Sequence, residues 1–350
     1  MAQSQEAQII LNQLNEPAFL VENGIVTATN EGAAKCMIST GMEVCSIIGS
    51  GIDEYKQFQG DGCLYLTLYL GSSVHTCCVT FWEGRQLFII NDQTHNAELQ
   101  ALSLAAGQLS IPLSEITLIM SQLSDMDATQ KSKINKNLYR LQRIIGNMSD
   151  AAQLIGHKPK KSIRELCSML YEILEKSRSL LMRNGVQVAY TLPNGPVFAA
   201  VNEELVTRAM YNMISNAVKF TPALKSISVT VEHRRDTLYI TVQDNGLGID
   251  YGKMGNVFQR YTRQPGLEDP KFGLGIGMSL VHTIAAIHDG TVLVEKLQPS
   301  GTKITMTLST RYEKSTDVKS PVLIPDLYGG QDQALIELSD ILPYQMFTDE

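Results

Sequence analysis

The chain has 350 residues, a formal net charge of −7 and 44% hydrophobic residues. This length allows two or three domains, and the negative charge argues against general binding to nucleic acids or anionic membranes. No apolar run approaches the roughly 18 residues of a membrane span and no signal pattern opens the chain, so we expect a cytoplasmic protein without a membrane partner. Six cysteines without C-x-x-C spacing indicate reduced thiols.

Residues 1–91 predict a small α/β domain. A hydrophobic stretch is interrupted at Asn23-Gly24, a pair typical of two-residue hairpin turns. Three strand-like runs follow, at residues 63–70, 74–82 and 86–91. This order, together with the Asn-x-x-Ala-Ala segment at residues 30–34, resembles a PAS sensor domain, although the resemblance names no ligand.

Between residues 92 and 158 the apolar pattern becomes heptad-like and predicts two helices on either side of a polar break at residues 124–130. The apolar residues recur every three or four positions, at Leu109, Leu113, Ile116 and Met120 and again at Ile134, Leu138, Leu141, Ile145 and Met148. An antiparallel hairpin of two such helices does not cover its own apolar stripe. We therefore expect a homodimer that forms a four-helix bundle.

Residues 159–310 predict a second α/β domain. Its first elements are expected to be a helix and two strands, at residues 162–183, 186–191 and 197–201. The remaining residues 311–350 are rich in turn formers, with one short amphipathic helix expected within residues 332–342. The sequence leaves open whether this tail packs on the preceding domain or binds a partner.

The first of three motifs is NMISNAVKF, which lies on a predicted helix that begins near Asn202. Asn212 and Asn216 are four residues apart and therefore share one face of that helix. Mg²⁺ prefers hard oxygen ligands, so the side-chain carbonyl of Asn216 can complete a shell shared with phosphate oxygens. Lys219 follows within a turn and offers a positive charge to phosphate.

The second motif, DNGLGI, follows an alternating strand, and the third, GLGIG, opens a predicted helix. The carboxylate of Asp244 can accept a hydrogen bond from an adenine amino group, and glycines in its turn leave room for the base. The N–H groups and positive dipole end of the helix after the third motif suit phosphate. The glycines concerned are Gly246, Gly248, Gly273, Gly275 and Gly277.

Together these motifs resemble the N, G1 and G2 boxes of the ATP-binding domain of sensor histidine kinases, a superfamily that includes gyrase B and Hsp90. Residues 257–263 resemble the F box of the lid, and residues 300–308, with Thr302, resemble the closing Gly-Thr strand. The resemblance implies a two-layer α/β sandwich of the Bergerat type that binds ATP and Mg²⁺. It also implies roles for individual residues: Asn216 on Mg²⁺, Lys219 and Arg263 on the phosphates, and Asp244 on adenine.

The hairpin likewise resembles the dimerisation and phosphoacceptor domain of these kinases, but it departs from the family at the acceptor. The segment GQLSIPL keeps Pro112 and Leu113 of the family pattern. Gly107 stands where the family has its acceptor histidine, and Gln108 where it has an acidic general base. Neither replacement can perform that chemistry.

We therefore interpret the chain as an α+β multidomain protein of two-component signalling. It is expected to bind ATP but to lack its own acceptor, and so to act as a nucleotide-responsive pseudokinase or as a partner in a phosphorelay. Its expected partners are a second copy of itself and a response regulator or another histidine kinase. Two alternatives stay open, an active kinase with an unusual acceptor such as His95 and a non-catalytic dimeric scaffold.

Overall fold

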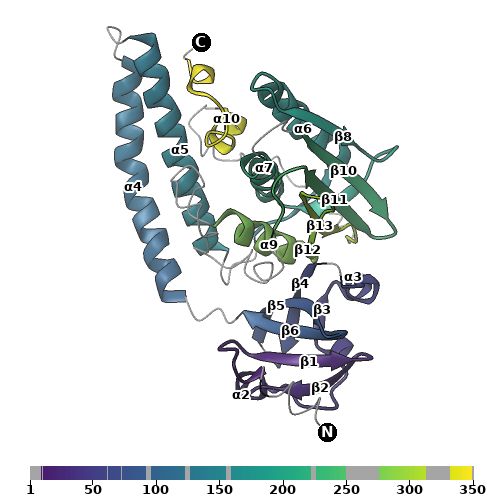
Figure 1. Ribbon diagram of the computed structural model, residues 1–350. Coiled ribbons are helices and arrows are strands. Elements are labelled where there is room, and N and C mark those ends of the chain that lie inside the picture. The colour runs from purple at the N-terminus through teal and green to yellow at the C-terminus, as the bar shows by residue number, and fades with distance from the viewer. Residues whose placement is uncertain are drawn as a thin grey trace.

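The computed structural model describes residues 9, 11–60, 62–71, 73–91, 96–122, 127–154, 159–221, 226–249, 276–312 and 332–348. Within these ranges none of the helices combines the length and hydropathy that a membrane crossing requires. A small sheet-rich unit at the N-terminus, two long helices and a larger layered unit follow one another along the chain (Figure 1).

The N-terminal unit is built on strands with short helices between them: β1 (Ala18–Glu22), β2 (Ile25–Thr29), α2 (Glu31–Lys35), β3 (Ile48–Ser50), α3 (Ile52–Gln57), β4 (Cys63–Leu70), β5 (Ser73–Trp82) and β6 (Arg85–Asn91). The hairpin turn predicted at Asn23-Gly24 is confirmed, because both residues adopt the positive φ (52° and 79°) that such a turn needs. Asn30 is buried, and its Oδ1 accepts from the backbone N–H groups of Ala18 (3.0 Å) and Ala33 (2.9 Å). It therefore caps α2 and fixes that helix to β1.

The two heptad helices are α4 (Asn96–Gln122) and α5 (Ala128–Gln153), which pack side by side (Figure 1). Leu113 and Met120 of the first apolar series are buried with residues of α5. Leu109 and Ile116 of the same series are 50% and 48% exposed. Other apolar side chains of α4 are exposed as well, at Ile111, Leu118 and Ile119. The helix is thus apolar on more than the face that α5 covers.

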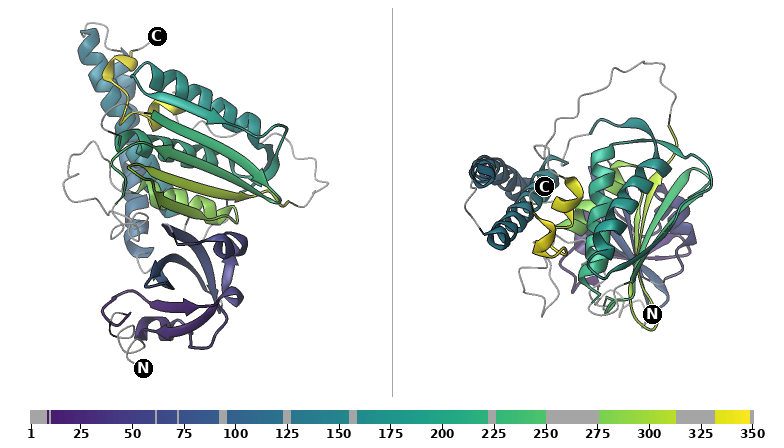
Figure 2. Two further views of the ribbon diagram at one scale, coloured as in Figure 1. Left: turned by 45° about the vertical axis from the view of Figure 1, so that its right-hand side comes forward. Right: turned by 90° about the horizontal axis from the view of Figure 1, so that it is seen from above.

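The larger unit is a sheet covered on one face by helices (Figure 2). Its main elements are α6 (Leu166–Met182), β8 (Gln187–Thr191), α7 (Glu203–Lys219), β10 (Ser226–Arg234), β11 (Thr237–Asp244), α9 (Gly277–Ile287), β12 (Val292–Lys296) and β13 (Thr302–Ser309). The strand order is β12-β13-β11-β10-β8, and β8 with β10 is the parallel pair among these strands. This is the helix-on-sheet arrangement that the sequence predicts for the ATP-binding segment.

The helix predicted from residue 162 begins later, at Leu166. Residues Ser162–Glu165 form strand β7, which pairs with β9 (Phe198–Val201). Glu165 explains the boundary, since its carboxylate accepts from the backbone N–H groups of Cys167 (2.9 Å) and Ser168 (2.7 Å). An N-cap residue has non-helical backbone angles, so the helix begins only after Glu165. The residues that lead up to it are extended and form β7.

The strands of the N-terminal unit and of the layered unit are joined edge to edge. Strand β4 pairs antiparallel with β12, Tyr65 opposite Val292 and Cys63 opposite Val294, so that eleven strands of the described chain form one sheet. Tyr65 is fully buried at this junction, with its ring 5.8 Å from that of His282 on α9. The N-terminal unit therefore contributes to the core of the layered unit.

The C-terminal segment, defined as residues 332–348, lies between α5 and the helices of the layered unit (Figures 1 and 2). It contains α10 (Gln333–Glu337) and a single 3₁₀ turn, Tyr344–Met346. Leu338, Leu342 and Phe347 are buried in this position. The tail thus packs on both the hairpin and the layered unit, which the sequence left open.

Gly62 lies close to β12 where β4 pairs with that strand, and its replacement tests this junction. Its φ is 132°, and a Cβ on this residue would lie 2.1 Å from the carbonyl oxygen of Val294 in β12. We expect Gly62→Ala to push β4 away from β12 and to lower the free energy of unfolding, measured in urea, by about 2 kcal/mol or more.

Gly84→Ala is the matched control. Gly84 also has a positive φ (78°), but no described atom lies within 4 Å of the added Cβ. Backbone strain alone costs about 1 kcal/mol there. Equal losses of stability in the two variants would show that the contact with β12 does not matter.

Candidate functional site

Asp244 ends β11 and is 6% exposed. Its Oδ1 accepts from the backbone N–H groups of Gly246 (2.8 Å) and Thr302 (3.2 Å). Burial raises the pKa of Asp244 above its ordinary value, although these two donors oppose the shift. A Cβ on Gly246 would lie 2.3 Å from the carbonyl oxygen of Phe220, and Gly248 has a φ of 73°. The structure thus brings together four predicted residues: Asp244, Gly246 and Gly248 lie at and after the end of β11, and Thr302 begins the neighbouring strand β13.

Asn212 and Asn216 lie on α7, which begins after the N-cap residue Asn202. Asn212 is 1% exposed, and its Nδ2 donates to the carbonyl of Arg208 (3.0 Å). A Cβ on Gly277 would lie 2.6 Å from Asn212 Oδ1, so a glycine lets the first turn of α9 approach α7. Asn216 follows one turn later and is half-buried, so its side-chain oxygen fits a cation that keeps water and phosphate as its other ligands.

Lys219 contacts Asp340, a residue of the C-terminal segment that no sequence motif singled out. Its Nζ lies 2.7 Å from Oδ2 of Asp340 in the C-terminal segment. Arg143 of α5 donates to the same oxygen at 2.6 Å, and Arg140 donates to Oδ1 at 3.2 Å. Arg143 also donates through Nη2 to Asn212 Oδ1 (3.3 Å). Arg143 of the hairpin therefore contacts both Asp340 and Asn212, a residue predicted to bind nucleotide.

Three cations, Arg140, Arg143 and Lys219, lie around the carboxylate of Asp340. Burial by itself raises the pKa of Asp340, but Arg143 and Lys219 outweigh it and lower that pKa to about 2. Burial and the neighbouring Arg143 lower the pKa of Lys219 to about 8, although Asp340 opposes this shift. The carboxylate is thus strongly favoured as an anion, whereas burial is the largest cause that disfavours the charged form of Lys219.

A second buried ion cluster adjoins the first. Glu337 of α10 is 1% exposed, with Oε1 3.7 Å from Arg208 Nε and Oε2 3.5 Å from Arg143 Nε. Arg208 Nη1 lies 2.5 Å from Oδ2 of Asp150 on α5. Burial raises the pKa of Asp150 to about 6 despite Arg208. Helices α5, α7 and α10 are therefore joined by buried charges, each of which needs its partners.

Four predicted residues, His95, Arg263, Gly273 and Gly275, and the lid segment 257–263 lie outside the described residues. Within the described ranges, His, Cys, Asp and Glu side chains do not gather into a group of three that could hold a metal.

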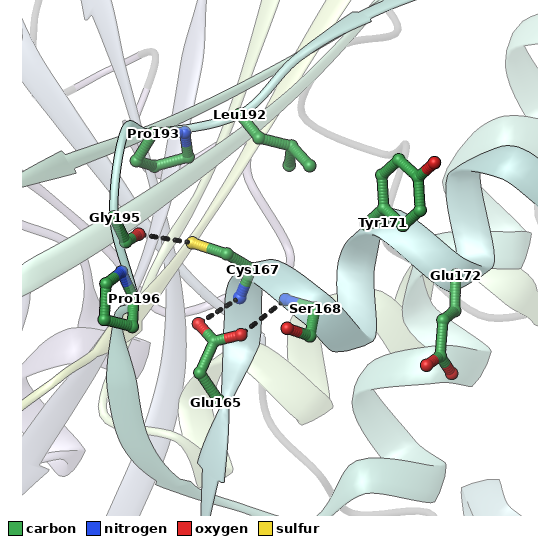
Figure 3. A pocket seen from close by; sticks show the side chains of 9 residues that line it. All are labelled: Glu165, Cys167, Ser168, Tyr171, Glu172, Leu192, Pro193, Gly195 and Pro196. Carbon is green, nitrogen blue, oxygen red and sulfur yellow. Dashed lines mark hydrogen bonds between the residues drawn. The ribbon is translucent and has the colours of Figure 1, made fainter.

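A shallow hollow of about 600 Å³ lies elsewhere, over the start of α6 (Figure 3). Cys167 Sγ donates to the carbonyl of Gly195 there (3.4 Å). Burial raises the pKa of Glu165, but hydrogen bonds from Ser168, Val197 and Cys167 lower it to about 2. These groups are engaged in capping and loop closure, so the hollow is a structural feature of the helix start.

Comparison with known proteins agrees with this geometry. Residues 201–312 match the family described as histidine kinase-, DNA gyrase B-, and HSP90-like ATPase. Sensor histidine kinase RppB of Synechocystis sp. is 25% identical over 226 residues, which are 62% of this chain and 50% of RppB. Sensor histidine kinase WalK of Bacillus subtilis is 29% identical over 135 residues, which are 38% of this chain and 22% of WalK. The chain thus spans half or less of the length of these relatives.

Among solved structures, full-length ShkA in complex with AMPPNP is similar in fold, with a TM-score of 0.51 and 17% sequence identity. The similarity covers 61% of this chain and 47% of ShkA. Residues 201–312 therefore form an ATPase domain of the type shared by histidine kinases, DNA gyrase B and Hsp90, and the chain is similar to sensor histidine kinases beyond this domain.

Proposed function

We propose that the chain binds ATP with Mg²⁺ between α7, the end of β11 and the start of α9. The observation that carries the proposal is the carboxylate of Asp244, whose Oδ1 is held by two backbone donors. Its other oxygen is the acceptor we assign to the adenine amino group. Asn216 would hold Mg²⁺ and Lys219 a phosphate, and the ion would neutralise phosphate charge.

We infer further that the protein is a pseudokinase at its own acceptor position. Gly107 is exposed on α4 and carries no nucleophile, and Gln108 beside it cannot accept a proton as a carboxylate does. Two histidines of the ATP-binding domain, His282 and His288, are buried. His288 Nε2 accepts from the backbone N–H of Asn202, and burial lowers its pKa to about 4. Because both imidazoles are buried, neither is exposed to accept a phosphoryl group in place of the missing acceptor.

The output of such a protein is a change of conformation on nucleotide binding, or phosphorylation of a partner's histidine in a mixed dimer. The exposed apolar side chains of α4 support a homodimer through the hairpin, since a second copy would cover them. The partners we propose are a response regulator or another histidine kinase. The rival functions are an active kinase that uses His95 and a scaffold in which nucleotide only stabilises the fold.

The variant Asp244→Asn tests the adenine contact. Asparagine keeps an oxygen for the N–H groups of Gly246 and Thr302, but it presents an amide donor in place of the second oxygen. We expect the variant to fold normally and to bind ATP at least about tenfold more weakly in isothermal titration. The exposed Asp236→Asn, which removes a pair with Arg311, is the control. Equal affinities would remove Asp244 from the site.

The variant Asn216→Ala tests the metal. Wild-type protein should bind ATP more weakly when Mg²⁺ is removed with EDTA, because the ion bridges Asn216 and the phosphates. Asn216→Ala should show the weaker affinity already in Mg²⁺, with little further change on adding EDTA. Titrations of both proteins in both buffers measure this difference. Full Mg²⁺ dependence in the variant would assign the ion to other ligands.

Labelling with ATP that carries a radioactive γ-phosphate tests the pseudokinase proposal. We expect no acid-labile label on the wild-type protein and a gain of label in the double variant Gly107→His/Gln108→Glu. The new imidazole has room, because no described atom lies within 4 Å of a Cβ on Gly107. The gain should vanish when Asn216→Ala is added. Label on the wild type that Asn216→Ala abolishes would instead support an active kinase, and His95 would be the first position to map.

A further inference from the structure

The cation cage, defined as Arg140, Arg143 and Lys219, is a binding site for an anionic group. Its members come from two different parts of the fold, α5 and the last turn of α7, and converge on the carboxylate of Asp340. Arg143 and Lys219 have side chains only 4% and 7% exposed, and Asp340 is 8% exposed. Glu337 is the other acid at the cage, 3.5 Å from Arg143 Nε.

The cage coincides with the phosphate end of the proposed nucleotide site. Lys219 is the residue assigned to phosphate, and Arg143 Nη2 donates to Asn212 Oδ1, one turn before Asn216 on the same helix. An oxygen of Asp340 lies 2.7 Å from Lys219 Nζ, which is the distance expected between an ammonium group and a phosphate oxygen. In the proposed site, the carboxylate therefore takes the position beside Lys219 that we assign to a phosphate oxygen.

We propose that Asp340 is an internal competitor of nucleotide, and that Arg140 and Arg143 take over the terminal phosphate of ATP once the carboxylate has left. This inference rests on the ATP site proposed above. If the C-terminal segment left without a replacement, Lys219 would lose Asp340 and Arg143 would lose both Asp340 and Glu337, and burying charges without their partners is strongly unfavourable. The cage thus holds either the carboxylate or a phosphate, and the two states exclude each other.

The C-terminal segment is also held by buried apolar side chains, Leu338, Leu342 and Phe347, and by hydrogen bonds to its backbone. Three of its backbone carbonyls accept hydrogen bonds from side chains outside the segment. Asn135 donates to Phe347 (3.3 Å), Lys136 to Leu342 (2.6 Å) and Asn184 to Ile341 (2.9 Å). These donors lie at the surface of preformed elements, so they regain water when the segment leaves. Docking of the segment and binding of nucleotide are coupled negatively and reciprocally through Asp340.

Titration of the full chain with Mg-ATP tests the competition. We expect Asp340→Asn to bind at least about tenfold more tightly than wild type, the factor produced when the docked state holds about nine tenths of the molecules. Asp332→Asn is the matched control, because it removes a charge paired with Lys176 in the same segment and keeps the helix cap. Adding Arg143→Gln to Asp340→Asn should cancel the gain.

The possible results separate this inference from the proposed function. Equal or weaker binding by Asp340→Asn, with wild-type binding that Asn216→Ala weakens, would overturn the competition and leave the ATP site standing. Absence of Mg-ATP binding in the wild type and in folded Asp340→Asn would overturn the ATP site itself, and the inference with it. A gain that survives Arg143→Gln would remove the arginine from the phosphate site.

Hydrogen exchange of the wild-type protein gives a test that needs no variant. By reciprocity, saturating Mg-ATP should speed amide exchange in residues 333–347, because nucleotide displaces the segment. Unchanged or slower exchange there, at a concentration that saturates the site in titration, contradicts the competition. The exposed β-turn at Arg235-Asp236 serves as an internal reference whose exchange should not change.

Discussion

The carboxylate of Asp340 is the contact on which the relative positions of the parts depend. It is shared by Arg140 and Arg143 of the hairpin and by Lys219 of the ATP-binding domain. Buried charges are tolerated only when their partners stay in place, so a movement of any one of these elements exposes or isolates the others. The docked C-terminal segment therefore adds to the direct contacts between α5 and α7, which are Arg143 with Asn212 and Asp150 with Arg208.

The shared sheet adds a second connection between distant parts of the chain. Strand β4 of the N-terminal unit pairs with β12, and Tyr65 packs its ring against His282 on α9. The first residue of that helix, Gly277, lies against Asn212. A chain of packed contacts thus runs from the N-terminal strands to α7 without passing through α4 or α5. These contacts connect β4 to α7 through α9, so a change in the packing of one strand or helix is felt by the next.

Much of the local structure could be predicted because it is encoded locally. Strand β4 follows from its apolar run, and the turn at Gly24 follows from a residue pair that favours positive φ. The pairing of β4 with β12 could not be predicted, since an edge contact depends on complementary surfaces formed only after folding. Asp340 is a similar case, because it lies 121 residues from Lys219 and 197 from Arg143 along the chain. A single acid in a turn-rich tail carries no periodicity that would indicate its partners.

In the proposed mechanism, the same cage lets a protein with Gly107 at the acceptor position respond to nucleotide. A ligand shifts a conformational equilibrium only through a difference in its affinity for the two states. In the proposed mechanism this difference requires no long-range transmission, because the phosphate and Asp340 compete for the same cations. Binding alone then frees the C-terminal segment from α5, and phosphate transfer is not needed. Loss of the nucleophile at Gly107 is therefore compatible with an intact Asn216, Lys219 and Asp244, since binding and chemistry depend on different residues.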